Sequence, residues 1–125
     1  MSALSVAAQA AYSRPDPNVL SPRAAEYDLL GRVTRRLSDG WRQREADLAG
    51  LLAAVDENER VWSTLAQEVA DPANSLPSDL RAKLFYLYEF ARHHGQQVRQ
   101  GKASAEILVE INTAVMRGLR GQVPA

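Results

Sequence analysis

Residues 58–90, NERVWSTLAQEVADPANSLPSDLRAKLFYLYEF, decide the fold of this chain. Apolar residues recur at helical spacing on both sides of a central corner. The stripe before the corner begins just upstream of the quoted stretch and consists of Val55, Trp62, Leu65 and Val69. The stripe after the corner consists of Leu80, Leu84, Leu87 and Ala91, the last of which directly follows the stretch. The corner, residues 71–77, contains Pro72 and Pro77 together with Asp71 and Asn74, so it cannot continue a helix. The stretch therefore predicts two helices that fold back on each other as an αα-hairpin.

The rest of the chain supplies two more helices that can cover this hairpin. Ser21-Pro22 is a typical helix start, and Ser38-Asp39-Gly40 is expected to end that first helix. The first half of the hairpin is predicted to begin near Arg44, and a last helix follows Ser104. The sequence thus predicts an all-α fold, an antiparallel bundle of four main helices within residues 21–121, followed by a tail at 122–125.

Residues 1–20 are expected to form a separate, smaller unit. Ala3 to Tyr12 is rich in alanine and favours a helix, but a helix of this length is not stable alone. Pro15 and Pro17 mark a linker. The prediction is a short N-terminal helix tethered to the bundle.

Composition limits the possible functions. The chain has 125 residues, enough for one domain, and no cysteine, which excludes disulfides and thiolate metal sites. Its 15 basic and 15 acidic residues balance, so direct contact with nucleic acid is not expected. The N-terminus lacks the pattern of a signal peptide, and no apolar run reaches the roughly 20 residues of a membrane span. We expect a cytoplasmic protein without a membrane partner.

No arrangement of residues in the sequence indicates catalysis. His93 and His94 are adjacent, so on a helix they point about 100° apart and cannot chelate one ion together. Glu89 and His93 are four residues apart, but a surface hydrogen bond explains that spacing. We expect no enzyme, no cofactor and no metal site.

Several polar and aromatic residues do not fit a simple core stripe. Tyr86 and Phe90 lie roughly 100–140° from the core stripe of their helix, so either the N-terminal helix or a partner is expected to lie on them. Asn58 falls on an apolar face, where it either fixes the register across the bundle or binds a partner's backbone. Asn112 and Met116 flank the inner face of the last helix.

Several segments, taken in order, resemble the FlaF family of bacterial flagellar proteins. The resemblance covers about Ala8 to Leu119. The segments are Ala-Ala-Tyr at 10–12, Glu26-Tyr27, Val33-Thr34-Arg35, Leu37, Asn58 with Trp62, the run 70–77 leading into Leu80-Arg81-Ala82, Ile111-Asn112 and Met116-Arg117-Gly118-Leu119. The linker at 13–20 is longer than the family pattern, and the helix after the corner is more aromatic.

The resemblance implies a role in flagellum biogenesis and motility. FlaF-type proteins are linked to flagellin synthesis and secretion, act with FlbT-type regulators of flagellin messenger RNA, and behave as flagellin secretion chaperones. A weaker analogy to FliS-type chaperones concerns architecture alone: helical bundles that hold the terminal segments of flagellin. The expected partner is therefore a terminal segment of flagellin.

A chaperone of this kind must offer an apolar groove that accepts a helix. The residues expected to line it are Tyr12, Trp62, Tyr86, Phe90, Asn112 and Met116. Each could instead serve in core packing. The alternative function is post-transcriptional regulation of flagellin expression with an FlbT-type protein, on messenger RNA or translation, through a basic patch of Arg32, Arg35, Arg36, Arg42 and Arg44. A third hypothesis is a purely structural bundle that assembles with an FlbT-type protein and has no direct client.

Overall fold

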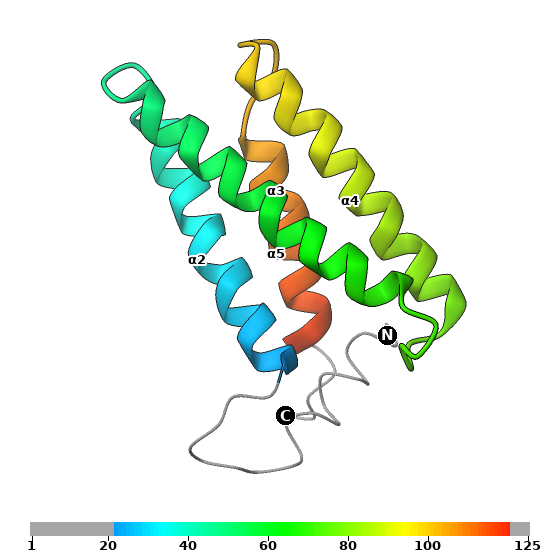
Figure 1. Cartoon of the computed structure of the whole chain (residues 1–125). Coiled ribbons are helices and arrows are strands. Elements are labelled where there is room, and N and C mark those ends of the chain that lie inside the picture. The colour runs from blue at the N-terminus through cyan, green and yellow to red at the C-terminus, as the bar shows by residue number, and fades with distance from the viewer. Residues whose placement is uncertain (1–21, 121–125) are drawn as a thin grey trace.

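The structure, a computed structural model, describes residues 22–120, and side chains for 25–118 (Figure 1). The described secondary structure is four α-helices. They are α2 (Pro22–Arg42), α3 (Leu48–Ala70), α4 (Ser78–Arg99) and α5 (Glu106–Arg120). The expected all-α bundle is confirmed. The predicted N-terminal helix and the tail at 122–125 lie outside the described residues.

Successive helices run up and down the bundle, so neighbours in sequence are antiparallel (Figure 1). α3 packs along α2 on one side and along α4 on the other, and α5 packs mainly on α2. α4 and α5 meet over a much smaller area. The bundle is therefore closed on three sides and more open between α4 and α5.

The corner between α3 and α4 is closed by its own side chains, as its composition predicts. Asp71 Oδ1 accepts a hydrogen bond from the Ala73 backbone at 2.9 Å, and Asn74 Oδ1 accepts one from the Leu76 backbone at 2.9 Å. Asn74 Nδ2 also donates to the Glu68 carbonyl near the end of α3, which accepts from the Asp71 backbone as well. These bonds satisfy backbone groups that the helix ends leave open, and they hold Leu76 in the core.

The expected end of the first helix at Gly40 is wrong. α2 continues to Arg42, the chain turns through residues 43–47, and α3 begins at Leu48 rather than near Arg44. Asp47 caps α3 by accepting from Gly50 N at 2.9 Å. Gly40 serves a close helix contact instead, because a Cβ there would lie 3.0 Å from Leu51 Cα.

This contact gives a first prediction. Gly40→Leu should lower the free energy of unfolding by about 1–3 kcal/mol, because the added side chain must push α3 away from α2. Urea denaturation measures the change. Gly31→Ala is the matched control on the same helix, since its Cβ would meet only flexible side-chain atoms at 3.9 Å. If both variants are equally stable, α2 and α3 do not pack as described.

Apolar side chains from all four helices form one core. Its most deeply buried members include Leu30, Val33, Leu37, Val55, Trp62 and Leu108. Gly95 lets α4 approach α3, where its Cβ would lie 3.3 Å from Val55 Cγ1. Of the helices described, none is long and apolar enough to cross a bilayer.

Candidate functional site

A buried hydrogen-bond network joins three of the helices around Asn112. Its Nδ2 donates to Asn58 Oδ1 at 2.8 Å and to Thr34 Oγ1 at 3.1 Å, while its Oδ1 accepts from Trp62 Nε1 at 2.8 Å. Thr34 lies on α2, Asn58 and Trp62 on α3, and Asn112 on α5. Buried polar groups that are satisfied in this way favour one alignment of the helices over others.

Three of the polar and aromatic residues considered in the sequence analysis lie in the interior as part of this network. Asn112 is 0% exposed, Trp62 1% and Asn58 2%. Trp62 and Asn112, both expected to line a partner groove, therefore do not line a surface in this structure. Asn58 bonds across the bundle, which corresponds to the first of its two interpretations.

The other expected groove residues are dispersed. Met116 is half-buried and packs against the core, with its Sδ 3.9 Å from where a Cβ on Gly31 would lie. Tyr86 and Phe90 are exposed on α4. Tyr12 lies outside the described residues. Among the described residues, the structure groups Trp62 with Asn112 in the core and Tyr86 with Phe90 on α4, so they do not form one site.

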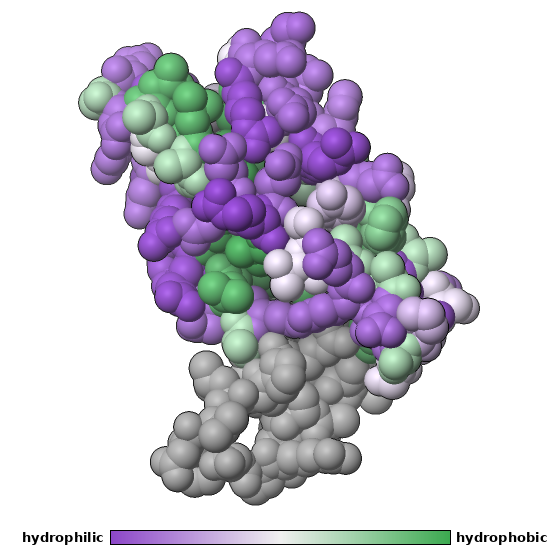
Figure 2. Space-filling view, in the orientation of Figure 1, coloured by the Kyte–Doolittle hydropathy of each residue, from purple (hydrophilic) through white to green (hydrophobic). Residues whose placement is uncertain are grey.

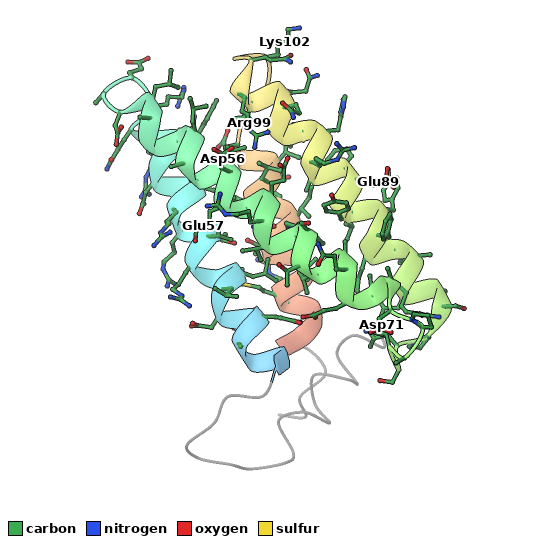
Figure 3. The ribbon with its side chains drawn as sticks, viewed as in Figure 1. Asp56, Glu57, Asp71, Glu89, Arg99 and Lys102 are labelled. Atoms are coloured by element: carbon green, nitrogen blue, oxygen red, sulfur yellow. The ribbon has the colours of Figure 1, made fainter. Side chains whose placement is uncertain are left out.

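The outer side of α4 carries exposed aromatic side chains. We call this surface the aromatic face. It consists of Ala82, Phe85, Tyr86, Glu89, Phe90 and His93. Tyr86 is 67% exposed, and Glu89 points outward from α4 in Figure 3. Apolar patches over α4 are visible among hydrophilic surroundings in Figure 2. The second stripe predicted for this helix is thus present, and no described element covers it.

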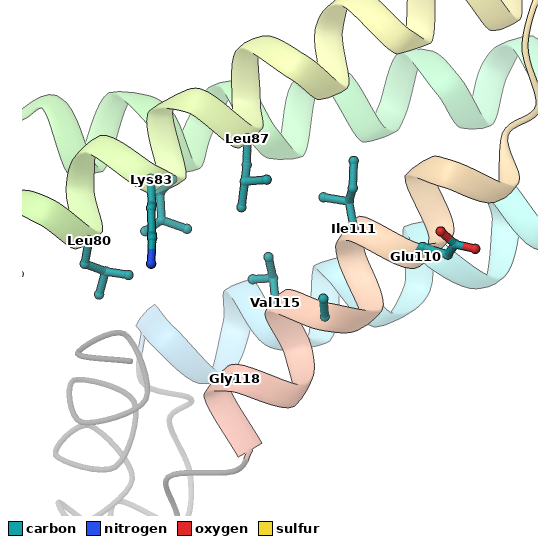
Figure 4. A pocket seen from close by; sticks show the side chains of 9 residues that line it. Leu80, Lys83, Leu87, Glu110, Ile111, Val115 and Gly118 are labelled. Atoms are coloured by element: carbon teal, nitrogen blue, oxygen red, sulfur yellow. The ribbon is translucent and has the colours of Figure 1, made fainter. Parts of the chain in front are cut away.

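A second surface lies on the other side of α4, where this helix faces α5 (Figure 4). We call it the α4–α5 groove. It has a volume of about 390 Å³ and is lined by Leu80, Lys83, Leu84 and Leu87 of α4 and by Glu110, Ile111, Ala114, Val115 and Gly118 of α5. Seven of the nine residues are apolar, so the groove can bury an apolar stripe of another helix.

Sequence reasoning had placed Leu80, Leu84 and Leu87 on the apolar stripe of α4 that packs in the core. It missed that the inner faces of α4 and α5 diverge and leave a groove. Ala114 and Gly118 give the signal that could have revealed it. They are four residues apart on one side of α5, and such small side chains cannot fill the space opposite Leu80 and Leu84.

The arginines of the proposed basic patch are mostly held by neighbours. Arg32 pairs with Asp28 at 3.1 Å, Arg36 pairs with Glu57, and Arg42 pairs with Asp39. The Arg44 guanidinium lies 3.9 Å from the ring centre of Trp41. Acidic partners therefore neutralise much of the positive charge along α2.

The described side chains form no cluster of three or more His, Asp or Glu that could hold a metal ion. His94 instead lies against the loop before α5, with Nε2 2.8 Å from the Ser104 carbonyl oxygen. Its ring also stacks on Phe90 at a centroid distance of 5.9 Å. This histidine therefore has a packing role in the fold.

Comparison with known families gives one match that covers most of the chain. The family model described as flagellar protein FlaF matches residues 8–119, a span that includes α2, α3 and α4 and all but the last residue of α5. Comparisons with curated proteins and with solved structures found no match. The chain therefore belongs to the FlaF family of flagellar proteins.

Proposed function

We propose that this protein is a flagellin-binding chaperone and export adaptor that holds a terminal segment of flagellin in the α4–α5 groove. The observation that carries the proposal is the groove itself. It is open and apolar, and two antiparallel helices form its walls (Figure 4). Family membership supplies the flagellar context.

The dimensions of the groove suit a helix as its occupant. From Leu80 to Leu87, α4 advances about 10 Å at 1.5 Å per residue, which equals two turns of a bound helix. A helix with apolar residues at positions i, i+3 or i+4, and i+7 places one stripe into a groove of this length. The terminal segments of unassembled flagellin are expected to be amphipathic and to self-associate. A chaperone that covers such a stripe keeps the flagellin monomeric.

The aromatic face favours a second partner. It lies on the outer side of α4, while the groove lies on the side toward α5, so the two surfaces need not compete for one ligand. This supports the alternative function, regulation of flagellin expression together with an FlbT-type protein. Direct binding of messenger RNA has less support, because ion pairs neutralise arginines of α2. Steep loss of binding with added salt would indicate RNA contact.

Calorimetric titration with monomeric flagellin tests the proposal. Intact flagellin should bind, and a flagellin truncated at one terminal segment should not. Truncation at the other end should leave binding unchanged. If intact flagellin does not bind, the direct chaperone function is wrong, and the interaction with an FlbT-type protein becomes the next one to measure.

A substitution in the α4–α5 groove tests whether flagellin binds there. Ala114→Arg should weaken flagellin binding about tenfold or more, because a long charged side chain then occupies the exposed floor of the groove. The matched control is Ala53→Arg, the same change at an exposed position of α3 that does not line the groove. Circular dichroism of both variants verifies the fold. Equal affinity of both variants for flagellin would place the binding site elsewhere.

A further inference from the structure

The α4–α5 groove contains two charged residues of opposite sign among its apolar lining. Lys83 comes from α4 and Glu110 from α5. Figure 4 shows Lys83 at the end of the groove near Leu80 and Glu110 at the end near Ile111. The groove is therefore apolar in its middle and charged at its ends, positive at one and negative at the other.

Both charges are available to a ligand. The side chains of Lys83 and Glu110 are exposed, and within the described part of the chain neither makes an ion pair. Other charged residues near the bundle surface do pair, as Arg99 does with Asp56 at 2.6 Å. An occupant of the groove would thus meet a free ammonium at one end and a free carboxylate at the other.

We infer that the helix held in this groove carries one acidic and one basic residue, one at each side of a two-turn apolar stripe. The acid lies against Lys83 and the base against Glu110. In Figure 4, Leu87 and Val115 lie between the two charged residues, so the acid and the base of the ligand flank its apolar stripe. The inference rests on the proposed function for the identity of the natural ligand.

Charge complementarity of this kind selects the ligand more than it adds affinity. A helix with two acids or two bases at these positions would place like charges at one end of the groove, and such contacts suppress wrong partners. Amphipathic helices are common in a cell, so an apolar stripe alone would not distinguish them. With these two charges, the groove can select a ligand helix by its charge pattern as well as by its hydrophobicity.

Three synthetic peptides with one common apolar stripe test this specificity. The first has an acid and a base bracketing the stripe, the second has two acids, and the third has two bases. The wild-type protein should bind the first about fivefold more tightly than the other two, as expected for exposed ion pairs. Lys83→Glu should prefer the peptide with two bases, and Glu110→Lys the peptide with two acids.

Two control variants change charge away from the groove. Lys102→Glu lies in the loop after α4 and Glu45→Lys in the turn after α2, and both positions are exposed. They should keep the wild-type preference. If the three peptides bind all proteins alike, or if none binds any of them, the inference is wrong.

Flagellin titrations separate this inference from the proposed function. If wild-type protein binds flagellin and both Lys83→Glu and Glu110→Lys bind it unchanged, only the inferred charge pattern fails. If wild-type protein does not bind flagellin, the chaperone function fails. The peptide series then still determines whether the groove selects ligands by charge.

Discussion

Replacement of Trp62 by alanine is expected to lower the free energy of unfolding by about 3–5 kcal/mol. The indole is 1% exposed and lies at the centre of the core, so its removal leaves a cavity that α2, α3 and α5 cannot close. It also leaves Asn112 Oδ1 without its donor. Since small domains are stable by about 5–15 kcal/mol in total, this loss is a large fraction of the stability of the protein.

Urea denaturation followed by far-ultraviolet circular dichroism measures this loss. Trp62→Phe should cost clearly less, because it keeps an aromatic ring in the core and removes chiefly the hydrogen bond. Trp41→Ala is the control for losing a tryptophan that is only half-buried, and its effect should also be smaller. If the Trp62→Ala protein is stable but no longer binds flagellin, Trp62 belongs to the partner-binding surface and not to the core.

Replacement of Asn112 by alanine is expected to cost about 2–5 kcal/mol, because it leaves two buried polar groups without a partner. Trp62 Nε1 loses its acceptor and Asn58 Oδ1 loses its donor. Thr34 is affected less, since its hydroxyl still donates to the Leu30 carbonyl. The same denaturation experiment measures the change.

Thr113→Ala is the matched control, because Thr113 is the next residue on α5 and its hydroxyl bonds only within its own helix, to the Val109 carbonyl. Its cost should stay below about 1 kcal/mol. The Asn58→Ala change should lower the free energy of unfolding by less in the Asn112→Ala background than in the wild type, since the two side chains share a hydrogen bond. Equal effects of Asn112→Ala and Thr113→Ala would contradict the network.

The helices and their order could be predicted from the sequence because they depend on local patterns. The corner at 71–77 stops α3 through its prolines and local hydrogen bonds, and the apolar stripes beside it identify the packed faces. The end of α2 could not be predicted in this way. A glycine such as Gly40 is typical of a helix end. Here it instead allows a close helix contact with Leu51, a residue of another helix.

The candidate site was less predictable, because it depends on how helices distant in sequence are placed. Asn112 and Trp62 are 50 residues apart, and only their packing reveals that they satisfy each other inside the core. Tyr86 and Phe90 were correctly placed on a second stripe, since the angle around one helix is a local property. The groove depends on the divergence of α4 from α5, and this cannot be inferred from the residue spacing within a single helix.

The limited contact between α4 and α5 has a consequence for the range of ligands. One wall of the groove, α5, is fixed to α2 by apolar packing and through the Asn112 network. The other wall, α4, is attached chiefly to α3, so the packing of α4 on α3 sets the width of the groove. Residues of α3 that do not line the groove therefore help to determine how bulky a helix it can accept.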